Sequence, residues 1–199
     1  MPDNARLMSG HMSDNLATEP TRRLLTAKQA DTVHRLTEAG VEEVRLTGYE
    51  SLSIRDVARR AGVAAATAYT YFGSKDHLLT EIFWRRLSAL APVDGSRGSA
   101  RERVVSVLRE LALLVSEEPE LAAGCTAAMF GSEPDVRQLR LYIGMKIHQR
   151  IEVAAGPGSP EGRLLELAYF GAMVEAGLGY TTYEHMADRL AEAAELIMG

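Results

Sequence analysis

The sequence predicts an all-α protein of about nine helices, with a small three-helix domain followed by a larger helical domain. Three observations support this. Apolar residues recur at helical spacing along most of the 199 residues. No stretch shows the sustained alternation of apolar and polar residues that a half-buried strand requires. Near residue 60, two short helical patterns are joined by a glycine, as in a helix-turn-helix.

The first helix is expected from about Ala27 to Leu46, and Gly48 and Tyr49 end it. Thr26 and Gln29 have the spacing of a capping box, in which each side chain bonds to the backbone at the other residue. Its apolar face comprises Val33, Leu36, Gly40, Val41 and Val44. We expect this helix to brace the two short helices that follow.

The second helix begins after Ser53, whose hydroxyl can accept from the free amides of the first turn. Residues at i, i+3, i+4 and i+7 then form one apolar stripe: Ile54, Val57, Ala58 and Ala61. Gly62 follows the stripe, where a left-handed backbone ends a helix without a steric penalty. These features predict a short helix and a tight turn.

The third helix is expected from Ala64 to Tyr71, with Ala68 and Phe72 turned inward. The other faces carry hydroxyl-bearing side chains: Thr67, Tyr69, Thr70 and Tyr71. A short helix after a tight turn, with polar groups where core residues are expected, is typical of a helix that reads DNA. Gly73 stops this helix, and Ser74 caps the next.

The fourth helix, Lys75 to about Leu90, is long and apolar enough to enter the larger domain. Five more helices are expected, at about 99–116, 119–130, 132–155, 161–180 and 184–198. Ser132 and Asp135 are interpreted as a capping box for the third of these. The predicted domains are a mobile N-terminal arm (1–26), a helix-turn-helix domain (27–74) and a ligand-binding and dimerisation domain (75–199).

The charges are unevenly distributed. The formal net charge is −5, but residues 1–90 carry 12 basic and 11 acidic side chains, and residues 91–199 carry 10 and 16. The positive share therefore lies with the helix-turn-helix, as DNA binding requires. A single cysteine, Cys125, excludes an internal disulfide and suits a reducing cytoplasm. Neither a signal peptide nor a membrane span is expected.

Enzyme classes find little support in the sequence. It contains no nucleophile motif, no phosphate-binding loop and no pair of cysteines. The five histidines show no metal-ligand spacing. We therefore expect neither catalysis, nor a metal site, nor a cofactor.

The chain resembles the TetR family of transcriptional repressors. The resemblance is strongest from Leu36 to Leu79 and includes GYESLSIRDVARRAGV (48–63), Thr67, Tyr69, Tyr71, Phe72 and GSKDHLL (73–79). Beyond this stretch, the helices match the family in number and length only. The resemblance implies an all-α homodimer, a DNA operator, and a pocket for a small molecule in the larger domain.

The resemblance also implies which residues contact DNA. Thr67, Tyr69 and Tyr71 would lie on the DNA face of the recognition helix, with Thr70 beside them. Lys75 and Ser53 would contact phosphates, and Arg55 would assist. The chain departs from the family at three alanines (64–66), at Ala68 and at Thr70. Contacts to thymine methyls, tyrosine hydroxyls and DNA shape would therefore carry more of the base reading.

The predicted ligand pocket combines flexible methionines with flat aromatic rings, which suits an adaptable apolar cavity. The candidates come from three helices: Cys125, Met129, Phe130, Tyr142, Met145, His148, Tyr169, Phe170 and Met173. At any one position, plain core packing is an equally good interpretation. Glu175 is either a pocket acid or a residue paired across a dimer interface.

The helix expected at 161–180 is apolar nearly all round, so it must be covered on several sides. We expect it to pair with the last helix, and with the copies of both in a second chain, as a four-helix dimer interface. The function expected is a DNA-binding regulator, released from a near-palindromic operator by an apolar or amphipathic ligand. The alternative is a helix-turn-helix dimer without an inducer, acting constitutively or under the control of another protein.

Overall fold

The computed structural model describes residues 26–199, and every element in that range is a helix. Of the expected N-terminal arm, only Thr26 lies within the described residues. The helices are α1 (Ala27–Ser51), α2 (Ile54–Arg60), α3 (Ala65–Tyr71), α4 (Lys75–Ala89), α5 (Ala100–Ala112), α6 (Pro119–Ala128), α7 (Pro134–Ala155), α8 (Pro160–Gly177) and α9 (Tyr183–Met198). The all-α prediction is confirmed for the described part of the chain.

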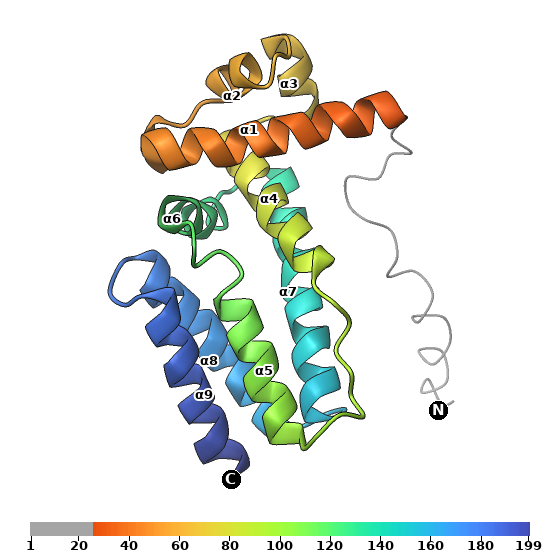
Figure 1. The fold of residues 1–199 in the computed structure, drawn as a ribbon, viewed down its shortest axis with the longest axis vertical. Helices are drawn as coiled ribbons and strands as arrows, with labels where there is room; N and C mark the ends of the chain where they lie inside the picture. Colours follow the sequence, from red (N-terminus) through yellow and green to blue (C-terminus); the bar gives the residue numbers. More distant parts are fainter. Residues whose placement is uncertain (1–25) are drawn as a thin grey trace, which may run out of the picture.

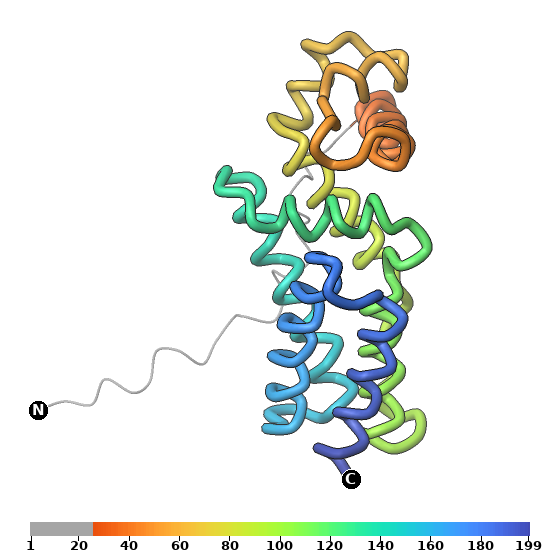
Figure 2. Tube along the Cα trace, turned by 90° about the vertical axis from the view of Figure 1, so that its left-hand side faces the viewer, coloured from red at the N-terminus to blue at the C-terminus, as the bar shows by residue number. Residues whose placement is uncertain are grey.

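The helices form two groups along the long axis of the molecule (Figure 1). At one end, α1 lies crosswise beneath α2 and α3. Helix α2 contacts both α1 and α3. At the other end, α5, α7, α8 and α9 run side by side, each in contact with the next around a four-helix bundle. Figure 2 shows the same elongated arrangement from the side.

Helices α4 and α6 connect the two groups. α4 contacts α1 at one end of the molecule and α7 in the bundle, while α6 contacts α1, α4 and α8. The buried apolar side chains form one continuous cluster that includes Leu36 of α1, Phe83 of α4 and Tyr169 of α8. The domain division at residues 74 and 75 remains a prediction.

The local signals around the helix-turn-helix are confirmed. Ser53 caps α2 by accepting from the Asp56 amide, and Ser74 caps α4 by accepting from the His77 amide. Gly62 has a φ of 64°, which a residue with a Cβ rarely adopts. Ala68 and Phe72 are 0% and 1% exposed, so the inward face of α3 is the one predicted.

The first helix is longer than predicted. It begins at the expected Thr26–Gln29 capping box but runs to Ser51, with a break at Gly48. Gly48 has a φ of 72° and a ψ of 169°, so the chain turns there before one last helical turn forms. The break aims that last turn at α4, where the Tyr49 hydroxyl donates to Asp76 Oδ1 at 2.7 Å.

Boundaries of three later helices differ from the prediction, and the first of these, α5, ends at Ala112 rather than near residue 116. The capping box at Ser132 and Asp135 is wrong, because α7 starts at Pro134 and its N-cap residue, Glu133, makes no side-chain cap bond. Proline at the first helical position needs no amide partner, so it can begin a helix without that bond. The next helix, α8, starts one residue early, at Pro160, and ends at Gly177 rather than near Tyr180. Gly179, with a φ of 78°, turns the chain towards α9.

Gly177 brings the end of α8 against α6, and we expect this contact to tolerate no side chain. A Cβ at Gly177 would lie 2.2 Å from Thr126 Cγ2. Gly177→Ala should therefore lower the free energy of unfolding by about 1–3 kcal/mol through overpacking.

The control for this prediction is Gly144→Ala on α7, where a new Cβ would meet no atom within 4 Å. That change should raise the free energy of unfolding by about 0.5–1 kcal/mol, because alanine favours a helix over glycine. Urea unfolding at one protein concentration compares the two variants. Equal effects would mean that Gly177 is not needed for the contact between α6 and α8.

Candidate DNA-binding surface and ligand cavity

The recognition helix α3 presents one face to solvent. Thr67, Tyr69 and Thr70 are exposed, and Tyr69 is 50% exposed although it is a large aromatic residue. Tyr71 is half-buried and packs against the core. The Thr70 hydroxyl already donates to the Ala66 carbonyl at 3.0 Å. Thr67 and Tyr69 are therefore the two hydroxyls on this helix that are best placed to reach a DNA base.

Ser53 and Arg55 lie at the start of α2. Ser53 Oγ donates to Asp56 Oδ2 at 2.5 Å, and this bond lowers the pKa of the Asp56 carboxyl. The Ser53 proton is thus engaged within the protein, and a phosphate contact at this residue would replace that bond. Arg55 is exposed, and it lies on α2 beside the predicted DNA face. Both roles remain predictions.

Lys75 is half-buried and bound to the end of α1. Its Nζ donates to the carbonyls of Tyr49, at 2.8 Å, and Glu50, at 3.2 Å, and it lies 4.1 Å from the centroid of the Tyr49 ring. Because an ammonium group has three donors, one remains for a phosphate. Lys75 therefore fastens α1 to α4, and the phosphate contact stays a prediction.

His77 lies at the junction of α3, α4 and α7. Its ring is in edge-on contact with Phe72, at 5.5 Å between centroids, and its Nδ1 lies 3.7 Å from Asp135 Oδ2. Burial lowers the pKa of His77, although Asp135, Glu81 and Glu133 act in the opposite direction. The neutral imidazole is therefore favoured at this junction.

We expect His77 to make the fold acid-sensitive. A folded-state pKa below the unfolded value of 6.5 means that the unfolded chain binds the proton first. The contribution of His77 is therefore present above pH 6.5 and is lost as the pH falls below it. When the pH is lowered from 7.5 to 5.5, the free energy of unfolding should fall less for His77→Leu than for the parent protein. Urea unfolding at both pH values measures this difference.

His148 provides the opposing control for that experiment. A bond to Glu166 Oε2, at 2.7 Å, raises its pKa, so its contribution is present below pH 6.5 and is lost as the pH rises. Glu166→Gln should remove this contribution and make the protein more acid-sensitive than the parent. If His77→Leu and the parent lose the same stability on acidification, the prediction for His77 is wrong.

A cavity of about 450 Å³ lies between α4, α6, α7 and α8. Its lining is mostly apolar or aromatic: Phe83, Thr126, Met129, Phe130, Arg140, Ile143, Gly144, Ile147, Tyr169, Phe170, Met173 and Val174. Arg140 is the one charged side chain in this lining, and its Nη1 donates to the carbonyls of Met129 and Gly131. A chamber of this size and lining suits a small apolar molecule.

The cavity brings together five of the ten predicted ligand contacts: Met129, Phe130, Tyr169, Phe170 and Met173. Its α7 wall was missed by the sequence prediction. Ile143, Gly144 and Ile147 follow the helical period there, and that signal could have found them, because they share a face with the buried Leu139. Arg140 and Thr126 were missed because a polar side chain carries no such signal.

The other five predicted contacts lie outside this cavity. Cys125 faces α4, where its Sγ donates to the Leu79 carbonyl. Tyr142 packs against the Trp84 ring. Met145 is 48% exposed on the outer face of α7, and His148 pairs with Glu166. Glu175 lies in a smaller cleft between α8 and α9, 3.5 Å from Arg189.

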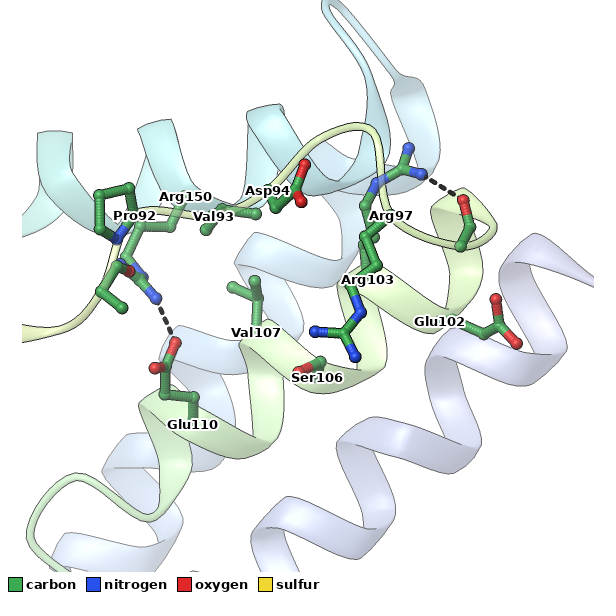
Figure 3. Close-up of a pocket in the computed structure, with 12 residues that line it drawn as sticks. Pro92, Val93, Asp94, Arg97, Glu102, Arg103, Ser106, Val107, Glu110 and Arg150 are labelled. Atoms are coloured by element: carbon green, nitrogen blue, oxygen red, sulfur yellow. Dashed lines mark hydrogen bonds and ion pairs between the residues drawn. The ribbon is translucent and has the colours of Figure 1, made fainter.

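A second, larger cleft of about 740 Å³ lies between the 91–98 loop, α5 and α7 (Figure 3). Arg150 pairs with Glu110 and donates to the Ala91 carbonyl at 2.8 Å. Arg103 donates to the carbonyls of Ala154 and Gly98 at 3.0 and 2.7 Å. These bonds tie the loop to the bundle, so the cleft is held together by polar contacts within the chain. The apolar cavity is the better candidate for a ligand.

Within residues 26–199, no helix is long and apolar enough to cross a membrane. The same range contains no group of three or more His, Cys, Asp or Glu side chains placed to hold a metal ion.

An exposed short helix after a tight turn, joined to a helical bundle with an apolar cavity, is typical of a helix-turn-helix transcriptional regulator. The family model of bacterial regulatory proteins, tetR family, matches residues 36–82. An uncharacterised HTH-type transcriptional regulator, Rv0767c of Mycobacterium tuberculosis, is 42% identical over 94% of this chain and 93% of its own length. The chain therefore belongs to the TetR family of transcriptional regulators, which are DNA-binding proteins rather than enzymes.

Further relatives extend the comparison. The HTH-type transcriptional repressor KstR of Rhodococcus jostii is 32% identical over 62% of this chain and 54% of its own length. A TetR transcriptional regulator from Rhodococcus sp. RHA1 has the same fold, with a TM-score of 0.69 and 23% identity over 87% of this chain and 98% of that one. FadR of Bacillus subtilis in complex with stearoyl-CoA has a TM-score of 0.61 and 18% identity over 81% of this chain and 96% of that one.

Proposed function

We propose that this TetR-family regulator is a homodimeric repressor that leaves a near-palindromic operator when an apolar or amphipathic molecule enters its cavity. The observation that carries the proposal is the position of α4. Its first turn adjoins α3 through Phe72 and His77, and Phe83, further along the same helix, lines the cavity. A ligand that displaces Phe83 therefore acts on the helix that supports the recognition helix.

Helix α6 provides a second connection between the cavity and α1. Met129 and Phe130, at its C-terminal end, line the cavity. At its N-terminal end, Glu118 pairs with Arg45 of α1 at 2.9 Å and with Arg86 of α4. A ligand that shifts α6 would move both partners of Glu118 with it.

Helix α8 supports the proposed dimer. Exposed apolar side chains recur at near-heptad spacing along α8 and its C-cap residue: Leu164 (56%), Leu167 (70%), Val174 (36%) and Leu178 (61%). Gly171 lies between them, and a Cβ there would meet no atom within 4 Å. Such a stripe on a monomer indicates a protein interface, and the glycine would let a second helix approach closely.

The proposed mechanism follows from these positions. Two chains would present two copies of α3 to successive major-groove faces, about 34–36 Å apart. A ligand releases DNA only to the extent that it prefers the conformation in which the two helices are out of register. A coupling of about 1–3 kcal/mol between the two sites would weaken operator binding roughly 5–150-fold.

The ligand bound to one structural relative supports the proposed type of ligand. FadR of Bacillus subtilis was solved in complex with stearoyl-CoA, a molecule with a long apolar chain and a polar head. The cavity here is apolar, with Arg140 as its one charged lining residue. An apolar or amphipathic molecule therefore fits both the lining and the comparison.

Selection of bound duplexes from a random DNA pool tests the proposal, and Tyr69→Phe then tests the recognition helix. Loss of the Tyr69 hydroxyl should weaken binding to the selected operator about 2–10-fold, which corresponds to one hydrogen bond. Binding to random duplex should not change. Gel shifts at several salt concentrations measure both affinities and the salt slope.

The control is Tyr180→Phe, which removes a hydroxyl from a residue that is 80% exposed in the turn between α8 and α9. It should leave both affinities unchanged. If Tyr69→Phe binds operator as the parent does, α3 does not read the operator through this hydroxyl. A pool that yields no preferred sequence would remove the basis for an operator altogether.

A further inference from the structure

The hydroxyl of Tyr169 is a buried polar group without a hydrogen-bond partner among residues 26–199. The side chain is 1% exposed, and it lines the cavity from α8. Its ring contacts Phe170 edge-on, with 5.6 Å between the ring centroids. The hydroxyl is the one polar atom of the side chain. Leaving such a donor unsatisfied costs about 1–3 kcal/mol, so buried polar groups are usually hydrogen-bonded.

The Tyr169 hydroxyl interacts electrostatically with Tyr183, whose own hydroxyl is paired with Thr126. Thr126, which also lines the cavity, has its Oγ1 3.2 Å from the Tyr183 hydroxyl. Burial, and then the nearby Tyr183, raise the pKa of Tyr169, so it keeps its proton at neutral pH. Because Thr126 and Tyr183 bond to each other, Tyr169 is the hydroxyl of this group that has no partner among residues 26–199.

The surroundings determine the kind of oxygen that this donor can meet. Arg140, the one charged residue of the lining, is exposed and bonded to the carbonyls of Met129 and Gly131 at the end of α6. Tyr169, Thr126 and Tyr183 are all buried. A carboxylate beside them would lose its hydration without a paired cation, which is costly. An uncharged oxygen loses far less hydration and still accepts one hydrogen bond.

We propose that Tyr169 is a specificity-determining residue, whose hydroxyl donates to an uncharged carbonyl or hydroxyl oxygen of an otherwise apolar ligand. This inference rests on the proposed function, because it assumes that the cavity binds the effector. It narrows the effector from apolar molecules in general to those that carry such an oxygen on the part that enters the cavity. Pure hydrocarbons would fit the space but leave the hydroxyl unpaired.

The test compares two probes of nearly the same shape. One is methyl octyl ketone, and the other is the alkene in which a methylene group replaces the ketone oxygen. Calorimetry measures the affinities of both probes for the parent protein and for Tyr169→Phe. The preference for the ketone over the alkene should fall about five- to tenfold in Tyr169→Phe, which is the effect of one hydrogen bond. Affinity for the alkene should be unchanged.

Two further measurements distinguish a ligand contact from a structural role. In the ligand-free protein, Tyr169→Phe should leave the Tm unchanged or raise it, because it removes a hydroxyl that has no partner. The infrared carbonyl stretch of the bound ketone should lie at lower frequency in the parent than in the variant. Tyr142→Phe is the matched control, since Tyr142 packs against Trp84 and does not line the cavity.

The outcomes separate this inference from the proposed function. If the alkene binds but the preference is the same in the parent and in Tyr169→Phe, the inference is wrong while a ligand-binding cavity stands. A water molecule that satisfies the Tyr169 hydroxyl would also make the preference for the ketone the same in the parent and in the variant. If Tyr142→Phe lowers the preference as much as Tyr169→Phe does, the inference is equally wrong. If neither probe binds, the proposed function fails, and the inference fails with it.

Discussion

Leu167→Glu should convert the protein to a monomer and reduce its affinity for the operator by roughly 100-fold or more. Leu167 is 70% exposed in the apolar stripe of α8, so a charge there should leave the fold of the single chain intact. Placed between two copies of α8, the same charge would be buried without a partner. Because a dimer binds its second half-site at high effective concentration, loss of the dimer removes about 10²–10⁴ of avidity. Sedimentation and gel shifts measure the two effects.

The matched control is Leu141→Glu. Leu141 is 68% exposed on α7, outside the stripe, and it receives the same change. This variant should remain a dimer and bind operator as the parent does. If Leu167→Glu remained dimeric with unchanged affinity, the α8 stripe would not be the interface. If both variants were monomeric, the interface would extend to α7.

Gly144→Trp should abolish the response to ligand and leave DNA binding intact. Gly144 lines the cavity, and a Cβ there would point into open space, so a large ring at this position fills room that a ligand needs. We expect the affinity for any ligand that stabilises the parent protein to fall roughly 100-fold or more. A loss of that size is about 2.7 kcal/mol of binding free energy. The regulator should then stay on its operator in the presence of that ligand.

Thermal shift measures the loss of ligand binding, since a ligand that binds the folded state raises the Tm. Gly144→Ala, which adds only a methyl group, serves as the control and should respond to ligand as the parent does. Ligand-induced release of Gly144→Trp from the operator at the parent's ligand concentration would show that the effector binds elsewhere. Loss of operator binding without ligand would show that the ring itself mimics the effector.

The local structure could be predicted from the sequence because its causes are local. The caps at Thr26, Ser53 and Ser74 each form with the side chain expected. The left-handed turn at Gly62 follows in the same way from a residue type whose geometry is known in advance. The capping box at Ser132 failed because Pro134 offers a competing way to begin the helix.

The cavity was only partly predictable, because helical spacing indicates which face is buried but not what that face meets. On α7, Ile143 and Ile147 share the inward face with the lining residue Gly144. Met145 lies on the outer face of the same helix, and His148 bonds to Glu166 of α8, although the chemistry of both residues suited a pocket. Residue type suggested these two positions, but it does not indicate which neighbour each side chain meets.

Lys75 shows a different limit. The family resemblance implies a phosphate contact, but the structure binds the ammonium group to the last turn of α1. That contact depends on the break at Gly48, which directs the Tyr49 and Glu50 carbonyls toward α4. No local pattern relates these residues, because the contact joins positions 25 and 26 residues apart.

We propose that two chains act together on one operator through the exposed face of α3. Fluorescence anisotropy of a selected operator duplex, titrated with protein at a concentration far above Kd, gives the number of chains bound at saturation. We expect saturation at two chains per near-palindromic site, and much weaker binding to a random duplex of the same length. Saturation at one chain per site, or equal affinity for the random duplex, would show that the proposal is wrong.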